Sequence, residues 1–171
     1  MIVLTMAAAA AGCSARVPSD GFKDLRYGMS LDELRSKGFN CQLTDHYCEP
    51  SPESEKYTLF GKEASVSVEA ANGKLAAVNV NVDLSSDELI SLYTKEFGSP
   101  KTFTYRSFGG QSERQYWHLG DRAAISVTRS VSRGDMSSFG VPMSSAKYLG
   151  PEATKELLKE ASSHTVRGGD F

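Results

Sequence analysis

The side chains best suited to chemistry in this chain of 171 residues are its three cysteines and three histidines. Cys41 and Cys48 flank the six residues QLTDHY, and two thiols this close are typical of a disulfide if the chain is exported, as its N-terminal segment (described next) indicates. A metal site that adds His46 to both cysteines is the competing interpretation, but it lacks a fourth ligand at regular spacing. We therefore expect a Cys41–Cys48 disulfide and no metal. Because the pair does not have C-x-x-C spacing, we expect a structural bridge without redox activity.

The third cysteine, Cys13, follows a run of uncharged apolar residues over 2–11. This run has the length of the hydrophobic region of a secretory signal and is too short to cross a bilayer. The segment Ala10-Ala11-Gly12-Cys13 resembles the lipobox of bacterial lipoprotein signals, whose cysteine is acylated and becomes the mature N-terminus. The alternative is a buried Cys13 in an Ala-rich helix, which the following segment SARVP does not favour.

That resemblance implies an address for the protein. Residues 1–12 would be a signal peptide, and Cys13 would carry acyl chains such as palmitate. Two or more chains give a lasting anchor, since each buried CH₂ adds about 0.8 kcal/mol. Ser14 occupies the position where Asp often retains such lipoproteins in the inner membrane, which favours the outer membrane, facing the periplasm.

Catalytic motifs do not emerge from the rest of the sequence. It contains no metalloprotease helix motif, phosphate-binding glycine loop or nucleophile elbow. His118 neighbours Trp117 on an expected strand and should face the opposite way, while His164 lies near the C-terminus. The acidic residues cluster at helix starts, where the helix dipole accounts for them. We expect no catalytic residues and no cofactor, so the chain is not expected to be an enzyme.

Two loop segments are the candidates for contact with a partner protein. Aromatic residues and methionine on loops adapt well to partner surfaces, although these residues could equally fold back onto the sheet. The candidate contact residues are Phe108, Gly109, Gly110, Phe139 and Met143.

Capping signals predict two short helices. Ser30 with Glu33, and Ser85 with Glu88, each form the S-x-x-E pattern of a capping box. The helices should end at Gly38 and at Gly98 respectively. The similar segments SLDEL and SSDEL are compatible with a tandem repeat, or with two independent uses of one good cap. A third helix should begin at Pro151.

Alternating apolar residues predict antiparallel strands. Residues 64–70 and 76–84 should form a hairpin around an Asn72-Gly73 type I′ turn, with Asn79, Asn81 and Asp83 facing water. Further strands are expected at 102–108, 113–119 and 122–131. The predicted fold class is therefore α+β: an antiparallel sheet of hairpins, two short capped helices packed on one face, and a C-terminal helix. The expected organisation is a signal peptide at 1–12, a lipidated tether at 13–21, a single α+β domain at 22–162 with a long surface loop at 132–150, and a frayed tail at 163–171.

Composition restricts the partners. The formal net charge is −2 and no cluster of Lys or Arg is present, which argues against nucleic acid. Contact with a membrane is expected through the acyl anchor, because no apolar run in the sequence approaches the ~20 residues that a membrane span requires.

Short motifs within residues 22–131 suggest a family. The segment YGMSLDEL, the capped helix that ends in FGSP and the strand with Trp117 are similar to the SmpA/OmlA (BamE-like) outer-membrane lipoproteins and to the β-lactamase-inhibitor-like α+β fold. The resemblance implies two helices on an antiparallel sheet and action by binding other proteins. We expect a non-enzymatic protein-binding or envelope-assembly accessory whose partner is another envelope protein. The alternatives are an inhibitor of a secreted hydrolase of the lysozyme or β-lactamase type, and a membrane-tethered enzyme with an unrecognised site.

Overall fold

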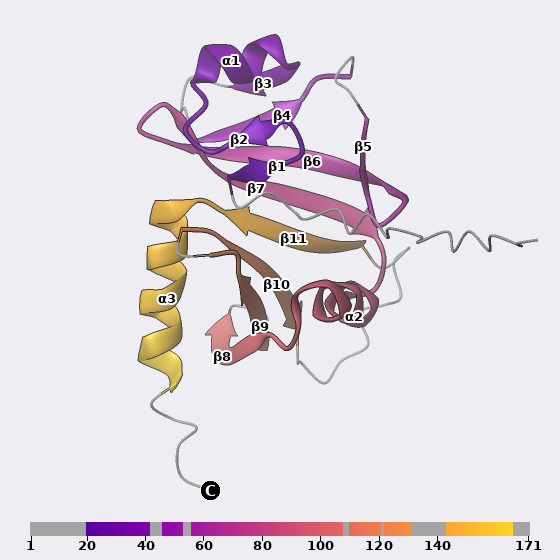
Figure 1. Ribbon diagram of the computed structural model, residues 1–171, viewed down its shortest axis with the longest axis vertical. Helices are drawn as coiled ribbons and strands as arrows, with labels where there is room; N and C mark the ends of the chain where they lie inside the picture. The colour runs from indigo at the N-terminus through magenta and orange to yellow at the C-terminus, as the bar shows by residue number, and fades with distance from the viewer. Residues whose placement is uncertain are drawn as a thin grey trace, which may run out of the picture.

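The computed structural model describes residues 20–41, 46–52, 56–107, 110–120, 122–130 and 143–165. The expected signal peptide and the tether up to residue 19, including Cys13, lie outside the described residues, as do Phe108, Gly109 and Phe139. The described part is an α+β fold, mostly antiparallel sheet with three helices, as the sequence predicts (Figure 1). None of the helices in these ranges combines the length and the apolar character that a membrane span needs.

Nine strands form the main sheet, and all their pairings are antiparallel. The order is β3-β4-β6-β7-β11-β10-β9-β8, with β5 paired to β6. The strands are β3 (Phe39–Cys41), β4 (Tyr47–Pro50), β5 (Tyr57–Leu59), β6 (Lys62–Ala71), β7 (Lys74–Asp83), β8 (Lys101–Ser107), β9 (Gly110–His118), β10 (Ala124–Ser130) and β11 (Met143–Leu149). The remaining elements are the small β1 (Gly21–Phe22) and β2 (Leu25–Arg26) pair and the helices α1 (Leu31–Ser36), α2 (Ser86–Phe97) and α3 (Pro151–Thr165).

The predicted hairpin is confirmed in β6 and β7. Asn72 and Gly73 both have positive φ, 53° and 71°, as a type I′ turn requires. The valines of β7 are buried as expected, but a bulge after Glu69 shifts the register. Ala77 and Asn79 lie on the other face of the sheet from these valines, and there Ala77 is buried and Asn79, predicted to face water, is half-buried.

The prediction of one long surface loop at 132–150 is wrong over its last part. Residues 143–149 form β11, which lies between β7 and β10 near the middle of the sheet (Figure 1). Ala146 and Tyr148 are fully buried on one face, whereas Ser145 and Lys147 point to the other. The sequence does not reveal this strand, because its small and polar residues hide the period-two pattern of burial.

The two faces of the sheet carry separate cores. Leu89 and Tyr93 of α2 pack on the larger core together with Trp117, Ile125 and Val127 of the sheet. The indole N–H of Trp117 donates to the Gly98 carbonyl at 2.8 Å and so fixes the end of α2 to β9.

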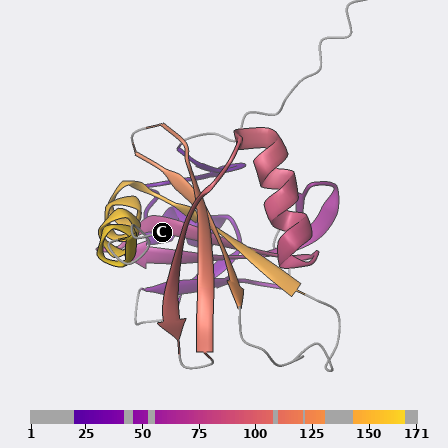
Figure 2. The same cartoon turned by 90° about the horizontal axis from the view of Figure 1, so that it is seen from below.

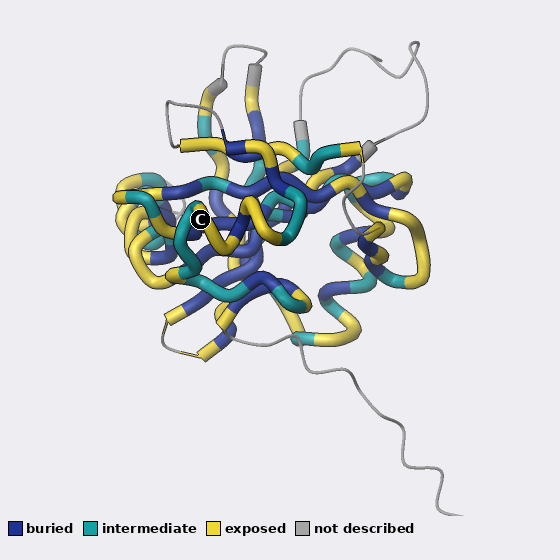
Figure 3. Tube along the Cα trace, turned by 90° about the horizontal axis from the view of Figure 1, so that it is seen from above, coloured by how far each residue is buried: buried dark blue, intermediate teal, exposed yellow. Residues whose placement is uncertain are grey.

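Helix α3 packs on the opposite face. Its buried Leu157 and Ala161 contact a smaller core, whose sheet residues are Ala77, Phe103, Tyr116, Ala124 and Leu149. Figure 2 shows α2 and α3 on the two sides of the sheet, and Figure 3 shows which positions along the chain are buried. Leu34 of α1 belongs to the same core as Leu89, so α1 and α2 contribute to one core and the C-terminal helix to the other.

Both ends of the folded part differ from the predicted boundaries. Gly21, expected in the tether, begins β1, where an added Cβ would lie 1.8 Å from the Leu25 carbonyl oxygen. At the other end, α3 continues to Thr165, so the expected frayed tail at 163–171 begins as helix. In this last turn the His164 ring lies parallel to the Phe103 ring of β8, with centroids 5.8 Å apart.

Candidate functional site

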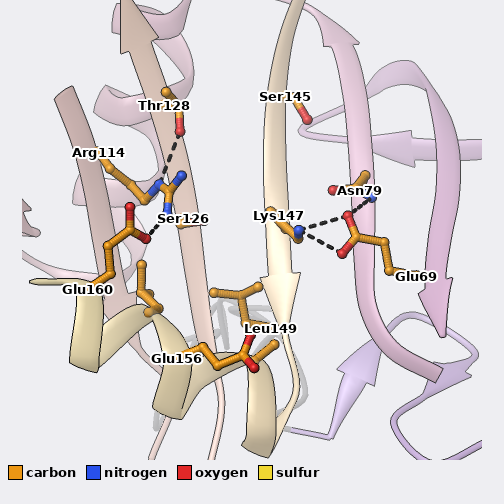
Figure 4. Close-up of a pocket in the computed structure, with 12 residues that line it drawn as sticks. Glu69, Asn79, Arg114, Ser126, Thr128, Ser145, Lys147, Leu149, Glu156 and Glu160 are labelled. Atoms are coloured by element: carbon orange, nitrogen blue, oxygen red, sulfur yellow. Dashed lines mark hydrogen bonds and ion pairs between the residues drawn. The ribbon is translucent and has the colours of Figure 1, made fainter. Parts of the chain in front are cut away.

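A polar groove of about 320 Å³ lies between the sheet and α3 (Figure 4). Five neighbouring strands and the helix contribute to its walls. The lining residues are Glu69, Asn79, Arg114, Ser126, Thr128, Ser145, Lys147, Leu149, Ala153, Glu156, Leu157 and Glu160.

The groove exists because α3 covers only part of its face of the sheet. Small apolar residues, among them Ala77 and Ala124, lie beneath the helix. Further along the same strands, the side chains that alternation places on this face are polar, such as Asn79, Ser126 and Ser145. The helix supplies Ala153, Glu156, Leu157 and Glu160, whose spacing of three and four residues places them on one face.

One wall is an ion pair with an added amide. The Lys147 Nζ lies 2.7 Å and 2.8 Å from the two carboxylate oxygens of Glu69, and the Asn79 amide donates to Glu69 Oε1 at 3.1 Å. Both charged side chains are 37% exposed, so solvent only partly screens them. Glu69 lies on the side of β6 opposite the buried Val68, and directly after it the register shifts, with Ala76 as the extra residue on β7.

Arg114 forms the opposite wall. It donates to Glu160 Oε2 of α3 at 2.6 Å, to the Tyr105 hydroxyl at 3.3 Å and to the Thr128 hydroxyl at 3.4 Å. Its guanidinium also lies 5.0 Å from the centroid of the Tyr105 ring, within cation–π range. This arrangement links β8, β9 and β10 to α3 and holds the guanidinium in place.

Between these two walls, the groove also contains polar side chains that take no part in the two ion pairs. Ser145 is exposed, and the Ser126 side chain is buried in the floor of the groove. Glu156 is exposed on α3, one turn before Glu160, and within the described ranges no ion pair or side-chain hydrogen bond joins it to another residue. The arrangement can therefore bind a polar or charged group through hydrogen bonds and charge.

The sequence-predicted cysteine pair forms a disulfide elsewhere in the fold. Cys41 of β3 and Cys48 of β4 are directly opposite in the strand register, with Cα atoms 4.2 Å apart. His46, the third member of the alternative metal site, is exposed just before β4. Within the described ranges, no group of three His, Cys, Asp or Glu residues is placed to hold a metal ion.

The predicted loop contacts and histidines do not join the groove. Of the expected contact residues, Gly110 begins β9 and Met143 begins β11, where they pair with Ser107 and Asp83 respectively. His118 is exposed on β9. The loss of part of its hydration, together with the charge of the nearby Lys101, lowers its pKa. Phe108, Gly109 and Phe139 belong to the undescribed segments.

Sequence reasoning missed every charged residue of the groove. Glu69 and Lys147 are 78 positions apart, and Arg114 and Glu160 are 46 apart, so no local motif links them. The signal in the sequence that could have indicated the groove is the set of polar residues at alternate positions of each strand. Polar residues on alternate positions indicate a face in contact with water, as expected for Asn79, and the sequence does not show that α3 lies against the same side.

A second group of unusual side chains is buried in the larger core. The hydroxyls of Tyr93 and Tyr148 are hydrogen-bonded to each other at 2.8 Å, and both side chains are fully buried. Burial raises the pKa of both phenols well above 10.0, and it raises that of Tyr27 as well. The buried Tyr27 hydroxyl has no hydrogen-bond partner among the described residues. These phenols belong to the packed interior and lie outside the groove lining.

Comparison with known proteins gives no match to a protein-family model, a curated protein or a solved structure. The groove, its charges and the sequence patterns are therefore the basis for a functional proposal.

Proposed function

We propose that this protein is a lipid-anchored, periplasm-facing lipoprotein that binds another protein of the bacterial envelope through the groove beside α3. The observation that carries the binding role is the groove itself, an open concave surface between two ion-paired walls. Such a surface recognises a partner through shape and charge. The proposed role is that of a non-enzymatic binding or envelope-assembly accessory in the outer membrane.

Two features support the proposed address. The Ala10-Ala11-Gly12-Cys13 segment resembles a lipobox, and the Cys41–Cys48 disulfide suits an oxidising compartment such as the periplasm. Residues 13–20 could span at most about 28 Å when fully extended. The folded part would therefore remain near the membrane surface, where its partners would be other envelope proteins.

The address is tested by the intact mass of the protein from a bacterial membrane fraction. The expected mass corresponds to loss of residues 1–12, addition of acyl chains at Cys13 and loss of two hydrogens at the disulfide. A Cys13→Ser variant is the control. It should carry no acyl chains and should be absent from the membrane fraction. An unmodified chain that retains residues 1–12 would refute the proposed anchor.

The binding role is tested by site-specific photo-crosslinking in living cells. A photoreactive residue at Ser145, exposed in the groove, should crosslink to an outer-membrane assembly protein. The same residue at Glu152, exposed on α3 outside the groove lining, is the matched control. A lysozyme or β-lactamase captured at Ser145 would favour the inhibitor alternative. Equal crosslinking at both positions would show that the groove is not the binding site.

A further inference from the structure

We propose that the groove recognises a basic side chain, lysine or arginine, on the partner protein, with Glu156 as the carboxylate that receives it. This inference rests on the proposed function, because it specifies what the same groove binds. It follows from the distribution of charge among the lining residues, three of which are glutamates and two of which are cations.

Both cations of the groove are already neutralised within the fold. Lys147 is bound by both oxygens of Glu69, and Arg114 is bound by Glu160 and by two hydroxyl groups. Hydrogen bonds between charged groups are short and strong, and the distances of 2.6–2.8 Å in these ion pairs fit that class. Each cation already has a carboxylate beside it, and an anionic ligand would be repelled by that carboxylate and by Glu156, so the structure does not favour an anion.

The third carboxylate leaves the groove with an excess negative charge. Glu156 lies one helical turn before Glu160 and makes no ion pair among the described residues. In Figure 4, Glu156 lies on α3, with the Arg114–Glu160 ion pair on one side of it and the Lys147–Glu69 ion pair on the other. A cation that enters the groove would therefore meet an unneutralised carboxylate without displacing an existing partner.

The remaining lining suits the rest of a basic side chain. Leu149, Ala153 and Leu157 provide apolar surface at the end of the groove beside Glu156, where the methylene stem of a lysine or arginine can pack. The hydroxyls of Ser126 and Ser145 can accept hydrogen bonds from an ammonium or guanidinium group. A volume of about 320 Å³ is at the small end of ligand sites, which suits one side chain better than a large cofactor.

The test is an NMR titration of the isotope-labelled full chain with short blocked peptides. The probe is acetyl-Gly-Ser-Lys-Ser-Gly-amide, and its control carries norleucine, which has a similar stem without the charge. The lysine peptide should shift the backbone amide signals of Ser126, Ser145 and Glu156 in a saturable way that weakens as salt is added. The norleucine peptide should leave these signals unchanged.

Two charge-matched variants locate the effect. Glu156→Gln should weaken binding of the lysine peptide by about two- to fivefold, as expected for the loss of one exposed ion pair. Glu152→Gln removes the same charge from the same helix outside the groove lining, and it should bind the peptide as the unaltered chain does.

Three results would overturn the inference: no saturable shift with the lysine peptide, equal binding of the norleucine peptide, or unchanged binding by Glu156→Gln. Saturable shifts with spermidine alone would assign the groove to a small free amine instead of a protein side chain. A failed peptide titration together with successful crosslinking at Ser145 would leave the proposed binding role intact and refute only the basic specificity.

Discussion

Removal of one hydroxyl from the Tyr93–Tyr148 pair should destabilise the fold more than removal of both. The two oxygens lie 2.8 Å apart and both side chains are fully buried, so neither hydroxyl has access to replacement water. Tyr93→Phe or Tyr148→Phe alone deletes the hydrogen bond and leaves the other hydroxyl without its partner. Loss of a buried hydrogen bond with a stranded partner costs about 2 kcal/mol, within a range of about 1–3 kcal/mol.

The double variant distinguishes this reasoning from simple loss of packing. With both hydroxyls removed, no polar atom of the pair remains stranded, and the expected cost is about 1 kcal/mol or less. The two single changes therefore sum to about 4 kcal/mol, and the double change should fall about 3 kcal/mol short of that sum.

Urea unfolding of the four proteins, followed by near-ultraviolet circular dichroism, measures these differences in free energy. Tyr47→Phe is the matched control, because Tyr47 is 45% exposed and water can replace its bond to the Ser67 hydroxyl. That control should change the free energy of unfolding by less than about 0.5 kcal/mol. Single and double changes that add within about 0.5 kcal/mol would refute the proposed coupling.

Three further predictions concern the disulfide, a close backbone contact and the buried phenols. Replacing Cys41 and Cys48 together by serine should lower the free energy of unfolding by about 2.5 kcal/mol through loss of loop-closure entropy; an unchanged urea midpoint under non-reducing conditions would contradict this. Gly150→Ala should lower the free energy of unfolding by about 1–3 kcal/mol, because the added Cβ would lie 2.8 Å from the Ala76 carbonyl oxygen. A thermal midpoint equal to that of the unaltered chain would show that the backbone adjusts freely. The folded-state pKa of Tyr148 is raised, so the contribution of this phenol to stability is fully present below the ordinary value of 10.0 and is lost as the pH rises above 10.0. An absorbance titration should show Tyr148 ionising only when the chain unfolds in alkali. Reversible ionisation of Tyr148 in the folded state would refute this.

The local elements were the predictable part of this fold. The hairpin of β6 and β7 follows from alternating valines and from an Asn-Gly turn whose two residues need positive φ. Helix α3 begins at Pro151, which suits a first helical position. The Cys41–Cys48 disulfide closes a short segment between adjacent strands. Each of these features depends on residues close together in the chain, so the sequence contains the whole signal.

The groove could not be predicted in the same way. The strand β11 contributes Ser145 and Lys147 to the groove, and its amino-acid composition is that of a loop. Its identity as a strand comes from pairing with β7 and β10, which satisfies its backbone groups inside the sheet. A strand in such a position needs little intrinsic propensity, because its neighbours on both sides hold it.

Short-range turn chemistry and periodicity specify the α+β class, the helix starts, the main hairpin and the cysteine pair, so these features can be predicted without a structure. Only the tertiary structure decided that α3 packs against the polar side of the strands and leaves part of it open. That packing brings Glu69 to Lys147 and Arg114 to Glu160, and it leaves Glu156 without an ionic partner among the described residues. The physical reason is that periodicity along a strand tells which side chains share a face, whereas what covers that face depends on contacts between distant parts of the chain.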